Sequence, residues 1–378
     1  MKKCGILTIN VSLMNYGNRL QNYALQCVLS KLGCDVATVN YKPTYPASSY
    51  EGAKSSNENV RKDKIRDTVS LIKRRSLFVR NRLANKDKRR KFDKFIHQYI
   101  CWTEHEYGIE SDFSPLDREF DFLVAGSDQV WNPYWEGTQP IYFMQFVSES
   151  KRIAYAASFG VSSVPEELEE QYKMYMDGIP NVSCREDAGC DLVQKLTGKR
   201  PVQVLDPVFL LDRKEWERIE EKPKGIGTGK PYILVYFLGD ITKENEEKIK
   251  QLQKEMGCRA IYLDRKDKIN ACFASPTEFL YLVHHARVVC TDSFHGSAFS
   301  IIYNKPLVCF QRSLNKGSTQ DMSSRLKSLF NLFACNRYDS VLSVSEMGEM
   351  EYQKINRILA REKEQSIAYL SHALEVEK

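Results

Sequence analysis

Residues 287–310, RVVCTDSFHGSAFSIIYNKPLVCF, contain an apolar run, a polar turn, a helical segment and a second apolar run. The pattern predicts strands over Val288–Cys290 and Leu307–Phe310, with a helix over His295–Tyr303 between them. Two strands joined by a helix of this length are typical of a βαβ unit, in which both strands run parallel. The stretch therefore predicts an α/β fold built on a parallel sheet.

The same alternation of strand and helix extends along the chain and forms two series. The first series of predicted strands is Cys4–Ile9, Val36–Val39, Phe120–Ala125, Arg152–Ala157, Val182–Cys184 and Val202–Leu205. The second adds strands Tyr232–Leu238 and Ala260–Leu263 and helices Lys243–Met256 and Thr277–Ala286. A chain of 378 residues exceeds the usual size of one hydrophobic core. We therefore expect two Rossmann-like α/β domains facing across a cleft.

The expected boundaries follow from these series. Residues 1–180 form the first domain, residues 181–345 form the second, and residues 210–229 are expected to be a surface connection. Residues 346–378 place Tyr352, Ile355, Leu359, Ile367 and Leu370 at helical spacing. This segment predicts a long amphipathic helix that crosses back onto the first domain.

Composition excludes several classes of protein. Hydrophobic residues make up 42% and charged residues 28% of the chain, which is ordinary for a globular protein and unlike a disordered one. The longest apolar run, Tyr232–Leu238, is far shorter than the roughly 18 residues of a membrane span. Eleven cysteines form an odd set without a CxxC pair, which favours free thiols and a cytoplasmic location.

The net charge of +6 is concentrated in one segment. Residues 51–100 hold sixteen Lys or Arg against six Asp or Glu, and basic runs at 73–75 and 88–91 flank apolar residues. One interpretation is a solvated, basic helical insertion in the first domain. The other is peripheral contact of residues 61–94 with anionic lipid at the inner face of the cytoplasmic membrane, or with a polyanionic substrate. We expect no nucleic-acid partner, because no recognised binding motif accompanies the charge.

Ligands of open α/β sheets bind beyond the carboxyl ends of the strands, so the residues that follow the strands are candidates. Two such stretches lie in the first half and offer amides, a carboxylate and an aromatic face suited to a sugar. Their candidate residues are Asn15, Gly17, Asn18 and Gln21 in the first stretch, and Ser127, Asp128, Trp131 and Asn132 in the second. The alternative interpretation of both is helix capping.

Two later stretches carry candidate catalytic residues. Arg185 follows a predicted strand and offers a planar fork suited to carboxylate or phosphate, the alternative being a salt bridge to Glu186, Asp187 or Asp206. His295 lies where a strand ends and a helix begins, and its alternative is a structural histidine with satisfied hydrogen bonds. No cluster of acids suggests a metal site.

These stretches, in this order, resemble the polysaccharide pyruvyl transferase family over nearly the whole chain. The resemblance is carried by five motifs, Tyr16-Gly17-Asn18, Gly126 to Asn132, Ser183 to Asp187, Asp206-Pro207 and Asp292 to Gly296. It implies a fold like that of the cleft-type glycosyltransferases (glycosyltransferase-B-like). It also implies transfer of a pyruvyl group from phosphoenolpyruvate to a sugar of a cell-surface polysaccharide or its lipid-linked precursor, forming a pyruvate ketal. Phosphoenolpyruvate is then a co-substrate, and no cofactor is required.

The resemblance also suggests roles for individual residues. Arg185 and His295 would be catalytic and would bind the donor together with Ser293, Gly296, Ser297 and Arg312, whereas the candidates of the first half would bind the acceptor. Many members of the family carry an arginine where this chain has Ser293, and an acid where it has Asn18. Arg312, Lys305 or Arg325 would have to replace the missing arginine, or the donor is different.

Two other functions stay open from the sequence. A glycosyltransferase that uses a nucleotide sugar would share the architecture. A non-catalytic protein of a glycan-assembly complex would keep the fold without donor binding.

Overall fold

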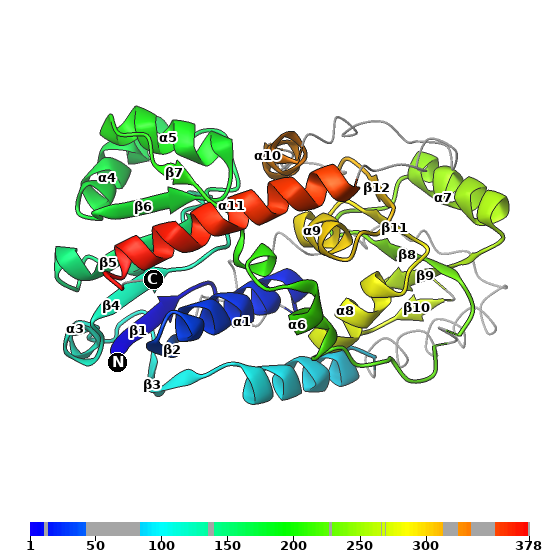
Figure 1. Ribbon diagram of the computed structural model, residues 1–378, viewed down its shortest axis with the longest axis horizontal. Helices are drawn as coiled ribbons and strands as arrows, with labels where there is room; N and C mark the ends of the chain where they lie inside the picture. Colours follow the sequence, from blue (N-terminus) through cyan, green and yellow to red (C-terminus); the bar gives the residue numbers. More distant parts are fainter. Residues whose placement is uncertain are drawn as a thin grey trace, which may run out of the picture.

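The computed structural model describes residues 1–10, 14–42, 84–134, 140–226, 229–265, 267–268, 270–312, 324–333 and 352–376. These residues form two parallel sheets flanked by helices, as expected (Figure 1).

The first sheet has seven strands in the order β3-β2-β1-β4-β5-β6-β7, all pairs parallel. The strands are β1 (Lys2–Leu7), β2 (Cys34–Tyr41), β3 (Trp102–Tyr107), β4 (Phe122–Ala125), β5 (Arg152–Ala157), β6 (Asn181–Cys184) and β7 (Val202–Gln203). The strand order reverses between β1 and β4, which is where the loops of such a sheet separate and leave room for ligands. The residues after β1 and β4 therefore lie where a site is expected.

The helices of the first sheet are α1 (Tyr16–Lys31), a helix over 84–99, α3 (Ser114–Glu119), α4 (Glu166–Asp177) and α5 (Asp187–Thr197). Short 3-10 turns lie at η2 (Pro140–Phe143) and η3 (Glu149–Lys151). Helix α1 presents Leu20, Ala24, Leu25, Val28 and Leu29 to the core, at the helical spacing that buries one face.

The second sheet has five strands in the order β10-β9-β8-β11-β12 and is also parallel. Its strands are β8 (Tyr232–Tyr236), β9 (Arg259–Leu263), β10 (Ala271–Cys272), β11 (Val288–Thr291) and β12 (Leu307–Cys309). Its helices are α7 (Lys243–Met256), α8 (Pro276–His284), α9 (Phe294–Ile302) and α10 (Ser324–Leu332). Here the order reverses between β8 and β11, so α9 begins at the second point where a ligand fits.

Sheet membership corrects the predicted domain boundary at residue 181. Strands β6 and β7 pair with the first sheet, so the first α/β unit extends to at least Gln203. The expected surface connection is also partly wrong. Turn η4 (Pro207–Phe209) and helix α6 (Arg213–Glu217) lie near its start, and Leu210, Leu211 and Trp216 are buried. Their apolar side chains draw this segment into the core.

Helix α11 (Tyr352–Ala373) crosses from the second sheet to the first, as predicted (Figure 1). The Ser366 hydroxyl accepts a hydrogen bond from Leu205 N at 2.9 Å, and Tyr369 donates to Ala154 O at 3.2 Å. Lys2 Nζ donates to Leu374 O at 2.7 Å, just beyond the helix. These contacts hold the end of the chain against the first sheet.

The helix over 84–99 carries part of the basic segment and packs against the second domain. Lys88, only 6% exposed, donates to Asp264 at 2.7 Å, and Lys91 donates to Glu278 at 2.9 Å. Phe92 and Phe95 are buried on the same helix. Lys88 and Lys91 thus form contacts between domains, which is at odds with their predicted role at a membrane. Residues 61–83 of that prediction lie outside the described part of the chain.

None of the described helices has the length and apolar character that crossing a bilayer requires. The ten cysteines among the described residues are all free of disulfides.

Candidate functional site

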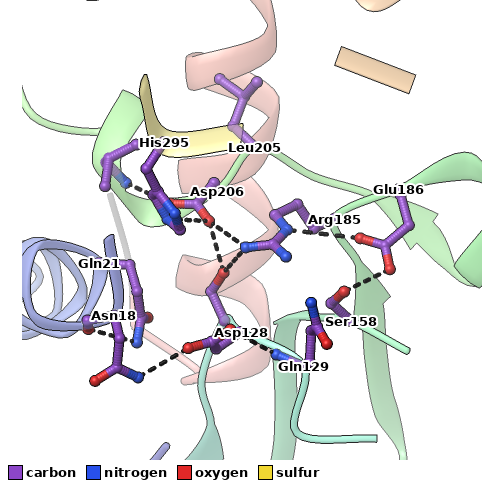
Figure 2. Close-up of polar contacts among 12 residues, drawn as sticks. Asn18, Gln21, Asp128, Gln129, Ser158, Arg185, Glu186, Leu205, Asp206 and His295 are labelled. Atoms are coloured by element: carbon purple, nitrogen blue, oxygen red, sulfur yellow. Dashed lines mark hydrogen bonds and ion pairs between the residues drawn. The ribbon is translucent and has the colours of Figure 1, made fainter. Parts of the chain in front are cut away.

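Asp206 is the centre of a polar cluster between the two domains. It follows β7 and caps η4, where its Oδ1 accepts from Val208 N at 3.0 Å. Its Oδ2 accepts from Ser127 Oγ at 2.8 Å and from Arg185 Nη1 at 2.7 Å (Figure 2). The side chain is fully buried, so the ends of β4, β6 and β7 meet at one carboxylate.

Arg185 follows β6 and reaches both domains. Its Nη1 also donates to Ser127 Oγ at 3.2 Å, and its Nε lies 3.5 Å from Glu186 Oε2. The guanidinium lies 4.5 Å from the centre of the Phe294 ring, which belongs to the second domain. Nη2 has no hydrogen-bond partner among the described residues, although the side chain is only 2% exposed. That buried N–H group is left without a partner by the described part of the fold.

Charges that face one another shift the pKa values of this cluster. Burial alone raises the pKa of Asp206, but His295 and Arg185 outweigh it and hold that pKa well below its ordinary value. Burial lowers the pKa of Arg185, and Asp206 and Glu186 reverse the effect and raise it. Both groups are therefore charged at neutral pH.

His295 comes from the opposite domain, in the first turn of α9. Its Nε2 lies 3.6 Å from Asp206 Oδ2, beyond hydrogen-bond distance, and has no hydrogen-bond partner among the described residues. Asp206 is thus shared by Arg185 and His295, and the two predicted catalytic residues do lie together. The side chain of His295 is 11% exposed, although Nε2 itself is buried.

Gly17 explains why the two domains can approach so closely at this point. A Cβ at this position would lie 2.0 Å from His295 Nδ1 and 2.2 Å from its Cγ. The first turns of α1 and α9 therefore meet with the imidazole against a bare backbone. No other residue type fits there without moving the ring.

The remaining residues of the amino-terminal stretch form a polar network beside His295. Asn15 caps α1 by accepting from Asn18 N at 3.2 Å, as in the capping interpretation. Asn18 Nδ2 donates to Ile9 O at 2.9 Å and to Asp128 Oδ2 at 2.8 Å (Figure 2). Gln21 donates to Thr8 Oγ1 at 2.9 Å, and its Oε1 has no hydrogen-bond partner among the described residues. Asp128, with φ at +104°, is half-buried and closes the network.

Trp131 and Asn132 are not placed to bind an acceptor. The Trp131 ring is 0% exposed and stacks on Phe143 with ring centres 5.6 Å apart. Asn132 is 3% exposed and accepts from Tyr134 N at 3.0 Å. The predicted acceptor contact of Trp131 is therefore wrong, because its ring is part of the core.

The predicted donor residues near α9 divide into two kinds. Ser293 caps α9 by accepting from Gly296 N at 3.3 Å, and a Cβ on Gly296 would lie 2.5 Å from Thr291 Oγ1. These two residues shape the turn. Ser297 is buried, and its hydroxyl has no hydrogen-bond partner among the described residues. Arg312 extends from beyond β12 and lies 3.6 Å from Asp292 Oδ2.

Of the other two cations considered for the missing arginine, only Arg325 is near. Burial, Arg185 and Arg312 lower the pKa of Arg325 to about 10, and its Nη1 and Nη2 lie 2.8 Å from the side-chain amide of Gln129, which follows β4. Burial and Arg213 lower the pKa of Lys305, which lies in another polar cluster with Arg213 and Glu220. From the sequence, Asp206 is considered only as an ion-pair partner of Arg185 and is not predicted as a site residue. Its position in the Asp206-Pro207 pair, directly after a predicted strand, is the signal that could have identified it.

Comparisons with known proteins agree with this architecture. A candidate UDP-N-acetylglucosamine 2-epimerase from Listeria monocytogenes is 11% identical with a TM-score of 0.51, and the match covers 100% of this chain and 98% of that one. The UDP-GlcNAc 2-epimerase from Neisseria meningitidis is 9% identical with a TM-score of 0.48, covering 100% and 95%. Glycosyltransferase SsfS6 from Streptomyces sp. SF2575 is 12% identical with a TM-score of 0.43, covering 99% of both chains.

The likeness to the Listeria monocytogenes protein confirms the predicted glycosyltransferase-B-like fold. No curated protein sequence matches the chain. The model of the polysaccharide pyruvyl transferase family matches residues 15–313, which include the motifs quoted above. The chain therefore belongs to the polysaccharide pyruvyl transferase family and is a transferase.

Proposed function

We propose that this protein transfers a pyruvyl group from phosphoenolpyruvate to two hydroxyls of one sugar, forming a pyruvate ketal. The acceptor is a sugar of a cell-surface polysaccharide or of its lipid-linked precursor, and the reaction takes place in the cytoplasm. The observation that carries the proposal is that His295 and Arg185, from opposite domains, share Asp206 while His295 Nε2 and Arg185 Nη2 keep no hydrogen-bond partner among the described residues.

The reaction requires an acid, an anion clamp and two positioned hydroxyls. A proton adds to C3 of phosphoenolpyruvate while the first sugar hydroxyl bonds to C2 and releases its own proton. The C2–O bond to phosphate then breaks, inorganic phosphate leaves with the electron pair, and the second hydroxyl bonds to C2 and loses its proton. The products are the cyclic ketal and inorganic phosphate, so the balance needs no oxidant or metal ion.

His295 suits the proton transfers, since an imidazole nitrogen can both donate and accept a proton, and Asp206 Oδ2 lies 3.6 Å from its Nε2. Arg185 suits the anion clamp because its planar fork matches carboxylate and phosphate oxygens. Its ion pair with Asp206 holds the guanidinium in place before the ligand arrives. Asn18 and Asp128 lie on the first-domain side and suit the hydroxyls of the acceptor.

Release of phosphate from phosphoenolpyruvate, measured with and without an extract of lipid-linked glycans, tests the proposal. We expect acceptor-dependent release, together with a ketal methyl signal in the NMR spectrum of the product. His295→Gln and Arg185→Gln should each lower release by at least about 100-fold. His97→Gln, an exposed histidine on the helix over 84–99, is the matched control and should keep full release.

Absence of release with every glycan extract would contradict the proposal. If a nucleoside diphosphate raises the stability of the folded protein and phosphoenolpyruvate does not, the protein is instead a nucleotide-sugar glycosyltransferase. Stabilisation by neither would favour a non-catalytic assembly protein.

A further inference from the structure

Arg325 is a buried cation without an acidic partner. It is in the first turn of α10 and 8% exposed. With the amide oxygen of Gln129 facing it, both Nη1 and Nη2 lie 2.8 Å from that oxygen, whereas Nε has no hydrogen-bond partner. Among the described residues, no carboxylate lies within ion-pair distance of this guanidinium. The hydrogen-bond acceptor of Arg325 is thus the neutral side-chain amide of Gln129.

The two acids that favour the charged form of Arg325 are engaged elsewhere. Glu186 lies against Arg185, and Asp128 accepts from Asn18 Nδ2 at 2.8 Å. Burial, Arg185 and Arg312 together lower the pKa of Arg325 to about 10, so its charged form is disfavoured where it stands. Burying a charge without a partner is costly, and proteins keep such a group where a ligand supplies the opposite charge.

The position of α10 directs Arg325 to the site described above. Ser328 Oγ accepts from Asp187 N at 3.2 Å, so α10 packs on the first turn of α5, directly after Arg185 (Figure 1). Gln129 follows Asp128, whose carboxylate accepts from Asn18 (Figure 2). Arg325 therefore lies between the start of α5 and Gln129.

We propose that Arg325, together with Arg185 and Arg312, forms a subsite for a small dianion, a phosphoryl group. The Gln129 oxygen, which accepts from both Nη groups, occupies the place of one phosphoryl oxygen in the empty site. The identity of that dianion as the phosphoryl group of the donor rests on the proposed function, but the subsite itself does not. Ser293 caps α9 in this chain, and the arginine that binds the phosphoryl group comes instead from α10.

Calorimetry with inorganic phosphate and with phosphoenolpyruvate on the full chain tests this subsite. We expect Arg325→Met to weaken both affinities by about 10- to 100-fold, as loss of a charge-assisted bidentate contact does, and Arg325→Lys to weaken them less. Arg152→Met is the matched control. That arginine is also buried, but its guanidinium donates to the carbonyls of Val147 and Gly178 and lies outside the site.

Stability in the absence of ligand separates a binding role from a structural one. Arg325→Met should lower the urea midpoint less than Arg152→Met, because Arg152 donates to several backbone carbonyls, whereas Arg325 shares one amide oxygen and has an Nε without a partner among the described residues. Unchanged phosphate affinity in Arg325→Met, or no phosphate binding by the wild type, would overturn the subsite. Phosphate binding that depends on Arg325, without phosphate release from phosphoenolpyruvate, would uphold the subsite and contradict the proposed reaction alone.

Discussion

Replacing Gly17 by alanine perturbs the position of the His295 ring without removing any polar group. The added Cβ would lie 2.0 Å from His295 Nδ1, whereas ordinary contact starts at 3.4 Å, so ring and helix must separate by about 1.4 Å. The atoms that meet the methyl are Nδ1, Cγ and Cε1 of the ring, so the imidazole as a whole must move away from Asp206 or the two domains must part.

The expected effects on rate and on stability differ in size. Misplacing a catalytic group by about 1 Å costs on the order of 100-fold in rate, so we expect turnover to fall at least that far. Overpacking costs about 1–3 kcal/mol, and the better helix propensity of alanine offsets about 0.5–1 kcal/mol of this. The protein should therefore stay folded, since a typical domain has about 5–15 kcal/mol of stability.

Acceptor-dependent phosphate release and urea unfolding measure the two effects side by side. Gly189→Ala is the matched control because it is also a glycine in the first turn of a helix, α5, and its Cβ would meet Cys184 Cβ at an ordinary 3.4 Å. It should keep wild-type turnover. Wild-type turnover in Gly17→Ala would refute the claim that the position of the His295 ring matters.

Three further predictions concern charge and packing. Asp206→Asn should cost about 3–5 kcal/mol at pH 7 by removing the closer carboxylate of a buried guanidinium, which keeps only Glu186 at 3.5 Å. Since the folded-state pKa of Asp206 is held low, its contribution is present above about pH 3.9 and is lost as the pH falls through the folded value. The difference from wild type in urea unfolding should therefore narrow at pH 3, and a constant difference would argue against the ion pair. Lys88→Met and Asp264→Asn should each destabilise the protein, with a coupling of about 0.5–3 kcal/mol in a double-mutant cycle, and additive effects would show that the contact between domains is weak. Trp131→Phe should lower the unfolding midpoint but leave the Michaelis constant for the acceptor unchanged, and a selective rise in that constant would restore a binding role for Trp131.

The regular part of the fold could be predicted from the sequence because its strands are apolar and its helices are periodic. Predicted and observed bounds coincide for β5, Arg152–Ala157, and for α7, Lys243–Met256. Strand β3, Trp102–Tyr107, was not predicted. It is an edge strand with a solvent-exposed face, so it carries polar residues and its sequence resembles that of a loop. The boundary at 181 was wrong because the pattern of a strand does not reveal which sheet it joins.

Only those site residues that directly follow a strand could be predicted from the sequence. Arg185 and His295 each follow a strand, and the carboxyl ends of both sheets face the same space, so their meeting could be inferred. Trp131 lies in an equally polar stretch, but its burial depends on Phe143, a contact that no local pattern shows. The lack of an acidic partner at Arg325 likewise depends on the tertiary structure and cannot be predicted from the sequence around it.

A crystal structure of the protein soaked with phosphoenolpyruvate is the most direct test of the central claim, that one anion bridges residues of both domains beside Asp206. We predict phosphoenolpyruvate oxygens within hydrogen-bond distance of His295 Nε2 and of Arg185 Nη2, both of which lack a hydrogen-bond partner in the described part of the chain. Phosphoenolpyruvate bound elsewhere, or a bound anion that contacts neither nitrogen, would contradict the account.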